Sequence, residues 1–348
     1  MNTLLISSFV ASVTTFVAIC LLRPFAISID LVDRPNHRKP HEGSIPLIGG
    51  IAMYIGVVVG ILISSYDLNQ YKYFLLASFI IIIVGVLDDH RNSSVTVRLL
   101  FQGLVALIII SAGGIVIESF GNLLGIGEIL LDEWSFLITV IAIVVAMNAV
   151  NMADGIHGLA GGNSLITSLA IIYLSIGVSS NTIFLLMLLL CAVLPIFLIH
   201  NLCLGISESK RIFMGDAGSM FIGLVIAYLL IDLSQGEDRA FAPITALWLF
   251  ALPLIEILTA ILRRLSSGKS PFKPDLYHTH HLLLRYGIRE KTTLILILLI
   301  SFLTAVIGIL GEIYNVSEWK MFVGFVLVFI MHLFFGFTLR KANLNQKR

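Results

Sequence analysis

Residues 135–162 read SFLITVIAIVVAMNAVNMADGIHGLAGG, an apolar run that ends in amides, a carboxylate and a cluster of glycines. A helix needs about 17 to 25 apolar residues to cross the hydrocarbon core of a bilayer, and the run from 135 to 151 meets that requirement. Polar side chains at the end of such a run are costly to bury in lipid and usually have a function. The stretch therefore predicts a membrane helix with chemistry at one end.

The composition of the whole chain points the same way. Of 348 residues, 58% are hydrophobic and 12% are charged, and the mean hydropathy is +1.00, which no water-soluble domain of this size tolerates. The net charge of +1 gives no general attraction to nucleic acid, so we expect no nucleic-acid partner. Cys20, Cys191 and Cys203 lack metal-ligand spacing and are interpreted as packing residues.

The sequence predicts an all-α, polytopic membrane protein with about eleven transmembrane helices in a single domain, 1–348. The first stretch is interpreted as a retained helix and not as a signal peptide, because it lacks a basic start. The predicted spans are 3–22, 47–65, 71–87, 98–117, 135–151, 163–178, 182–200, 217–233, 242–262, 292–311 and 319–339.

Basic residues concentrate in cytoplasmic loops, and this rule orients the predicted spans. The loops after the first, third, fifth, seventh and ninth spans, together with the C-terminal tail, contain 19 of the 22 Lys and Arg. The exceptions are Lys72, Arg239 and Lys320. This split predicts an outer N-terminus and a cytoplasmic C-terminus. Most of the histidines and the acidic motifs described next fall on the same side, which predicts a cytoplasmic working face.

The span 71–87 runs directly into Asp88 and Asp89. Two adjacent carboxylates in such a place can hold a metal, or one of them can act as a general base. The alternative interpretation is a solvated helix end. Arg98, further along the chain, could reach the lipid headgroups or bind a phosphate.

Within the opening stretch, Asn148, Asn151 and Asp154 fall three residues apart, so they would share one face of a continuing helix. Oxygen ligands in such a row suit Mg²⁺, and the glycines that follow allow the backbone to approach a ligand closely. The alternative is a capped helix followed by a turn. A second carboxylate, Asp216 in FMGDAGSM (213–220), opens a predicted span, where either an N-cap role or an anion favoured by the helix dipole would explain it.

The longest predicted inner loop contains PFKPDLYHTHH, residues 271–281. Its histidines have no cysteine beside them and lie in cationic surroundings, which favours binding of an anionic phosphate over zinc. A loop that is basic only because it is cytoplasmic would explain the Lys and Arg but not the three histidines. The flanking basic residues are Arg263, Arg264, Lys269, Arg285 and Arg289.

These motifs, in this order and over nearly the whole chain, resemble those of the polyprenyl-phosphate N-acetylhexosamine-1-phosphate transferase family, which includes the MraY, WecA and TagO enzymes. The segments DRPNHRKPH (33–41), IPLIGG (45–50) and PFKPD (271–275), with the His-x-His-His at 278–281, are most similar to the WecA group. Members of that group are expected to have eleven spans and an inner C-terminus.

The resemblance implies a role for each matching residue. It assigns catalysis to Asp88 and Asp89, and it assigns Mg²⁺, with Mn²⁺ as a substitute, to Asp216 and Asn151. It implies substrate binding by Lys39, Arg98, Asp154, His157, His278, His280 and His281.

Two positions depart from the family pattern. Asn92 stands where many members have a third acid, so that carboxylate is not essential in this chain. His157 stands where the WecA group usually has an aspartate near the nucleobase, which leaves the role of this residue open. A histidine there could still donate a hydrogen bond to uracil.

The resulting expectation is an enzyme that transfers N-acetylglucosamine 1-phosphate from UDP-N-acetylglucosamine to undecaprenyl phosphate and releases UMP, at the cytoplasmic face of a bacterial inner membrane. Its product would start a cell-envelope polysaccharide. Its partners would be these two substrates and membrane lipid, and a homodimer is left open. The alternatives are the same chemistry with another UDP-N-acetylhexosamine, or a secondary transporter, although no internal repeat is found. The expected active-site loops lie near 33–50, 88–98, 148–162, 211–219 and 263–291.

Overall fold

The computed structural model describes residues 2–34, 43–91, 93–178, 180–271 and 275–345, and these residues are mostly helical. Lys39, a predicted substrate-binding residue, lies outside them. A short antiparallel pair, β1 (Val32–Asp33) and β2 (Ile45–Pro46), precedes the second helix. The α-helices are α1 (Asn2–Ser28), α2 (Gly49–Ile63), α3 (Lys72–Arg91), α4 (Val95–Ser111), α5 (Ser135–Ala153), α6 (Leu159–Ser175), α7 (Asn181–Asn201), α8 (Gly215–Ser234), α9 (Pro243–Leu249), α10 (Ala251–Ser266), α11 (Thr279–Arg285), α12 (Glu290–Ile313) and α13 (Glu318–Asn345).

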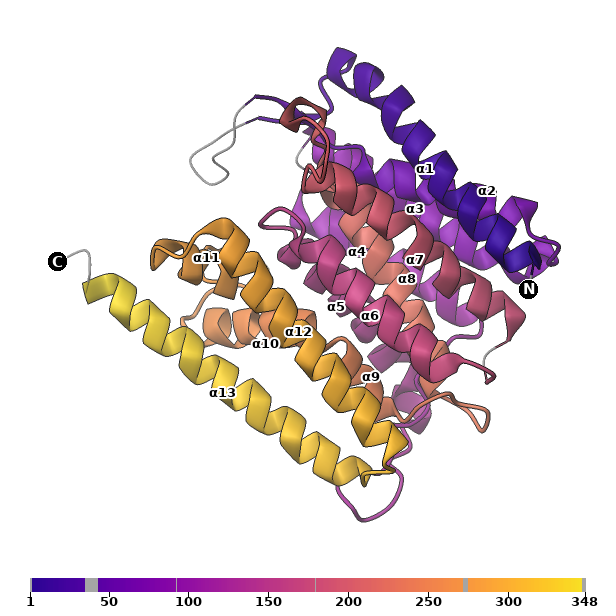
Figure 1. The fold of residues 1–348 in the computed structure, drawn as a ribbon. Helices are drawn as coiled ribbons and strands as arrows, with labels where there is room; N and C mark the ends of the chain where they lie inside the picture. Colours follow the sequence, from indigo (N-terminus) through magenta and orange to yellow (C-terminus); the bar gives the residue numbers. More distant parts are fainter. Residues whose placement is uncertain (1, 35–42, 92, 179, 272–274, 346–348) are drawn as a thin grey trace.

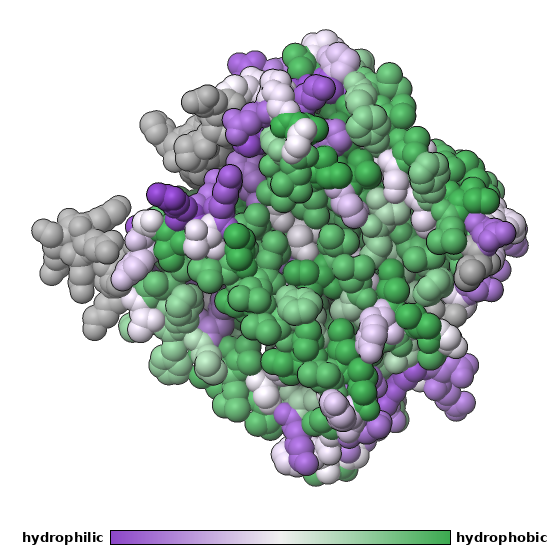
Figure 2. Space-filling view, in the orientation of Figure 1, coloured by the Kyte–Doolittle hydropathy of each residue, from purple (hydrophilic) through white to green (hydrophobic). Residues whose placement is uncertain are grey.

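The long helices lie side by side, and the two ends of the chain lie on opposite sides of the molecule (Figure 1). Apolar residues cover most of the face shown in Figure 2, while polar residues gather toward its edges. Among the described residues, seven helices are long and apolar enough to cross a membrane, and α2, α4 and α6 are shorter apolar helices. The prediction of a polytopic helical membrane protein is confirmed.

The predicted span 242–262 is not one straight helix. It consists of α9 and α10, which meet at an angle of 85°. Pro253 explains the break, because proline has no N–H to donate to the carbonyl four residues earlier and its ring clashes with that carbonyl. The carbonyl concerned belongs to Leu249, and it accepts a hydrogen bond from Thr167 Oγ1 at 2.9 Å instead. A side chain of α6 therefore satisfies the backbone group that the break releases.

Helix α8 is the centre of the fold and packs against α2, α3 and α5 (Figure 1). Of the residues in the apolar stretch of α8, 89% are buried inside the protein. Its neighbours approach so closely that side chains have no room: a Cβ on Gly85 would lie 2.2 Å from Ala217 Cα, and one on Gly50 would lie 2.1 Å from Gly218 Cα. Small residues at helix contacts allow this close approach in membrane proteins.

Replacing Gly85 by alanine should therefore destabilise the protein, because the new methyl group meets helix backbone that cannot move aside. Overpacking of this kind costs roughly 1–3 kcal/mol. Gly103→Ala in α4 is the matched control, because a Cβ at Gly103 meets nothing within 4 Å. Thermal unfolding of the purified proteins in detergent should show a lower midpoint for Gly85→Ala and no loss for Gly103→Ala. Equal midpoints would contradict the close packing of α3 on α8.

Candidate active site

The N-terminus of α8 is held by a carboxylate from another helix. Asp89, at the end of α3, accepts hydrogen bonds from the backbone N–H of Asp216 at 2.7 Å and of Ala217 at 3.2 Å. The first N–H groups of a helix have no partner within the helix, and a negative charge there is favoured by the helix dipole. Gly215 leads into the helix with φ +73°, and a Cβ on it would lie 2.5 Å from Asp89 Oδ2. Asp89 therefore fixes the position of the first turn of α8.

That first turn carries Asp216 into a polar cluster built from four helices. Arg98 Nη1 of α4 donates to Asp88 Oδ2 of α3 at 3.1 Å and lies 3.8 Å from Asp216 Oδ2. Asn151 Nδ2 of α5 donates to Asp216 Oδ1 at 2.6 Å and to Ser219 Oγ at 2.9 Å. The side chain of Asp88 is only 5% exposed, whereas that of Asp216 is 35% exposed. Asp216 is thus the accessible carboxylate of the cluster.

The donor set of this cluster fits Mg²⁺. Among the described residues no group of three or more His, Cys, Asp or Glu is placed to hold a metal. Mg²⁺ does not need one, because it is commonly held by one or two carboxylates and completes its octahedron with water and phosphate oxygens. Asp216 and Asp88 flank the same guanidinium, and a half-turn of the Asn151 amide would present its Oδ1 next to Asp216.

The predicted row of Asn148, Asn151 and Asp154 on one helix face is not formed, because α5 ends at Ala153 and Asp154 has left the helical conformation. Asn148 Nδ2 donates instead to Gln102 Oε1 at 2.7 Å and to the Val144 carbonyl at 2.8 Å, both away from Asp216. Asn151 is the member of this row whose amide is bonded to Asp216.

The turn after α5 is held by an amide from α7. Gly158 has φ +78°, and its N–H donates to Asn201 Oδ1 at 2.6 Å. Asn201 Nδ2 donates in turn to the carbonyl of Ile212 at 2.9 Å. One side chain thereby joins the α5–α6 turn to the segment that leads into α8.

His157, on the same turn, is paired with Glu290 at the start of α12. Its Nδ1 lies 2.5 Å from Glu290 Oε1, and its backbone N–H donates to the same oxygen at 3.3 Å. The ring packs against Phe213, with centroids 5.3 Å apart, and its Nε2 is buried without a hydrogen-bond partner in the structure. Glu290 therefore orients the ring and leaves Nε2 as the ring nitrogen that has no partner among the described residues.

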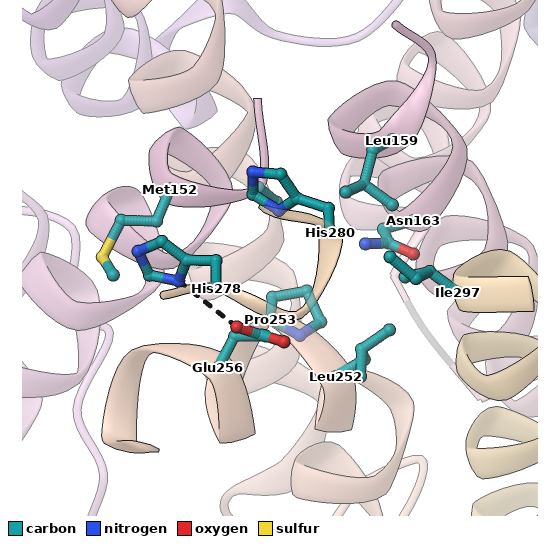
Figure 3. A pocket seen from close by; sticks show the side chains of 10 residues that line it. Met152, Leu159, Asn163, Leu252, Pro253, Glu256, His278, His280 and Ile297 are labelled. Carbon is teal, nitrogen blue, oxygen red and sulfur yellow. Dashed lines mark hydrogen bonds and ion pairs between the residues drawn. The ribbon is translucent and has the colours of Figure 1, made fainter. Parts of the chain in front are cut away.

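The three histidines of the inner loop lie together against the α5–α6 turn. The rings of His278 and His280 are stacked 5.8 Å apart, and His281 lies 4.1 Å from His280 between centroids. A Cβ on Gly155 would come within 2.1 Å of His280 Nε2, so a glycine is required where the loop docks. The structure thus brings the histidine loop next to the end of α5, as Figure 3 shows for Met152, His278 and His280.

Two of the arginines that we expected to bind phosphate at this loop are instead paired with a carboxylate of the loop itself. Arg263 donates to both carboxylate oxygens of Asp275, at 2.8 and 2.9 Å, and Arg264 Nε donates to the same carboxylate at 2.8 Å. Burial opposes ionisation of Asp275, but the bonds from the two arginines prevail and lower its pKa to about 2. The cationic face that we expected from the flanking residues is therefore smaller.

A cavity of about 20 Å³, enough for one water molecule, lies between the histidine loop and α5, α6, α10 and α12 (Figure 3). His280 Nε2 and Asn163 Oδ1, from two of its lining residues, are buried and have no hydrogen-bond partner in the described part of the chain. Burial is the main cause that lowers the pKa of His280 to about 3 and that of His281 to about 4, with the neighbouring His278 adding to both effects. Both rings are therefore neutral at pH 7.

Several residues of the site were missed in the sequence. Gln102, Glu256 and Glu290 each bind a side chain that we predicted to be functional. The signal was present for the first two, because a polar residue inside an apolar span is rare and usually has a partner. Glu290 begins a span, where an acidic residue is expected on other grounds, so nothing in the sequence distinguished it.

Comparison with known proteins gives a consistent result. The model of glycosyl transferase family 4 matches residues 71–234. The chain is 36% identical to the undecaprenyl-phosphate alpha-N-acetylglucosaminyl 1-phosphate transferase of Escherichia coli strain K12, over 98% of this chain and 93% of that one. It is 38% identical to the enzyme of the same name from Haemophilus influenzae, over 95% and 93% of the two chains, and 36% identical to that of Yersinia pestis, over 92% and 87%.

Acid should destabilise the protein through His280. Its folded pKa of about 3 lies below the ordinary value of 6.5, so the unfolded chain takes up a proton first as the pH falls. The contribution is complete above pH 6.5 and is lost progressively toward pH 3, which amounts to about 2 kcal/mol between pH 7 and pH 5. Thermal unfolding at these two pH values should show a smaller loss for His280→Gln than for the wild type. The same loss in both proteins would contradict a buried, neutral His280.

Proposed function

The chain belongs to glycosyl transferase family 4, among the polyprenyl-phosphate N-acetylhexosamine-1-phosphate transferases, and on that premise we propose that it transfers N-acetylglucosamine 1-phosphate from UDP-N-acetylglucosamine to undecaprenyl phosphate. The observation that supports this most directly is the meeting of Asp88, Arg98, Asn151 and Asp216 from four helices around one accessible carboxylate. The relatives, whose names state the transfer of an N-acetylglucosaminyl 1-phosphate group with undecaprenyl phosphate, match over nearly their whole length.

In the proposed reaction, an oxygen of the lipid phosphate attacks the sugar-linked phosphorus of the nucleotide sugar in line. The new P–O bond replaces the bond to the bridging oxygen, and UMP leaves with that oxygen and its electron pair. The chief obstacle is the repulsion between two anions, so the protein acts by positioning and charge compensation. A phosphate monoester is already largely ionised at neutral pH, which makes the demand for a protein base modest.

Arg98 supplies the positive charge from the protein side. Asp88 holds its guanidinium at 3.1 Å, so we assign Asp88 the task of orienting Arg98. Both oxygens of Asp89, the second predicted catalytic residue, accept N–H groups from the first turn of α8. We therefore assign Asp89 to the positioning of Asp216.

We propose that Asp216 and Asn151 hold Mg²⁺, with Mn²⁺ as a substitute. The ion would neutralise the charge that develops on the leaving UMP. Without the ion, Asn151 Nδ2 orients Asp216 and is bonded to Ser219, one turn further along α8; the half-turn of the amide would exchange these contacts for Oδ1 toward the ion. The histidine loop and Asp154 would bind the sugar and phosphate groups of the donor.

We further propose eleven spans, with the bent pair α9–α10 counted as one, an outer N-terminus and a cytoplasmic C-terminus in a bacterial inner membrane. The opposite placement of the two ends of the chain supports an odd number of spans (Figure 1). The distribution of Lys and Arg supports the orientation, and the bacterial relatives support the location. The active-site loops would then face the cytoplasm, where nucleotide sugars are available.

The decisive experiment offers the purified protein several UDP-sugars with undecaprenyl phosphate and measures UMP and lipid product. We expect release of UMP with UDP-N-acetylglucosamine, dependent on the lipid and abolished by excess EDTA, because UMP without charge neutralisation is a poor leaving group. Asp216→Asn should lose at least a hundredfold in turnover while remaining folded. Asp238→Asn, an exposed acid beyond the other end of α8, is the control. Full activity in EDTA would refute the metal assignment, and solute uptake without UMP release would indicate a transporter.

His157 should contribute to nucleotide binding more than to turnover. When the neutral ring donates from Nδ1 to Glu290, its Nε2 is an acceptor, as an aspartate oxygen would be, and suits the N3–H of uracil. His157→Ala should raise the Michaelis constant for UDP-N-acetylglucosamine severalfold, the equivalent of about 1 kcal/mol, with turnover unchanged. His157→Asp should remain active. A fall in turnover of two orders of magnitude at saturating nucleotide would assign His157 to the chemistry instead.

A further inference from the structure

The last helix of the chain reaches the histidine loop through two side chains of α13. His332 Nε2 lies 3.3 Å from Glu256 Oε1 and 3.4 Å from Thr279 Oγ1. Further along the same helix, the guanidinium of Arg340 lies 4.7 Å from the centre of the Tyr277 ring. Tyr277 and Thr279 are the residues immediately before and after His278, the first histidine of the loop.

Glu256 is the point at which α10, α13 and the loop meet. Its carboxylate faces His278 Nδ1 at 3.2 Å and accepts the N–H of Thr279, the first residue of α11, at 3.3 Å. A carboxylate on one ring nitrogen fixes the orientation of a histidine and the direction in which the other nitrogen points. Glu256 thus orients the ring of His278, as Figure 3 shows, and also fixes the start of α11.

His332 is an unusual residue for its position. Helix α13 lies at the edge of the molecule (Figure 1), and only 6% of the residues in its apolar stretch are buried. The side chain of His332 is nevertheless only 14% exposed, and it is directed to Glu256. A polar side chain in an apolar span is costly and usually has a function. The apolar contact of α13 with Trp248 is made elsewhere on the helix, by Met321 and Phe325.

We propose that His332 is a positioning residue for the transfer reaction: by holding Glu256, it fixes His278 and the start of α11 in the arrangement that binds the donor. This inference rests on the proposed function only in assigning the donor to the histidine loop. The positioning itself is a property of the protein without substrate.

Steady-state kinetics with UDP-N-acetylglucosamine tests the effect on the reaction. His332→Ala should lower kcat/KM about tenfold, mainly through KM, as expected when a hydrogen bond to a charged group is lost. His332→Gln, which keeps an N–H donor, should recover part of this loss, and Met331→Ala, a neighbouring position that is 69% exposed, should match the wild type. If His332 acts through His278, then adding His332→Ala to His278→Ala should cost less than twofold, whereas a general weakening of the fold would multiply the two losses.

Hydrogen exchange of the loop, measured without substrate, tests the positioning independently of activity. Amides of 275–285, Thr279 among them, should exchange about tenfold faster in His332→Ala than in the wild type or in Met331→Ala. If the alanine variant does not fold, His332→Phe, which keeps a ring but has no N–H, should show the same faster exchange of these amides. Unchanged exchange, or a multiplicative double variant, would overturn the inference. A wild type that releases no UMP would instead overturn the proposed function, and the exchange result would still decide the role of His332.

Discussion

The geometry of the site depends on one carboxylate that holds the N-terminus of one buried helix. Asp89 accepts the N–H groups of Asp216 and Ala217 in the first turn of α8, and this contact determines where Asp216 lies. It is possible only because Gly215 adopts a positive φ and leaves room for the carboxylate. The glycine contacts of α8 with α2 and α3 act in the same direction, since they let the backbones approach closely enough for side chains of four helices to meet.

Charged groups in such a bundle are costly, and the structure compensates for that cost locally. Asp88 is nearly inaccessible but is paired with Arg98, and Asp89 is paired with helix N–H groups. Asp216 alone remains partly open. A carboxylate that is oriented by an amide and accessible from one side can receive a cation or a phosphate with little rearrangement, which is the property that a positioning enzyme needs.

The histidine loop is positioned by a different device, the proline break between α9 and α10. Pro253 redirects the chain by 85°, and α10 then carries Glu256 to the base of the loop. Glu256 contacts His278, Thr279 and His332, while Asp275 accepts hydrogen bonds from Arg263 and Arg264. The loop is therefore held by partly buried carboxylates on both sides, and its inner histidine stays neutral because it is shielded from water.

The sequence by itself determined the class of the protein and most of its apolar helices, and it singled out most of the residues of the candidate site. Apolar runs predict membrane helices because lipid leaves the backbone no other partner, and polar residues at the ends of those runs stand out because they are costly. Only the tertiary structure decided which of those residues act on each other. Asp88 and Asp89 are neighbours in the chain with the same chemistry, yet one faces Arg98 and the other the start of α8. Likewise, no local pattern relates Glu290 to His157 or His332 to Glu256, because each pair is joined only when distant helices pack.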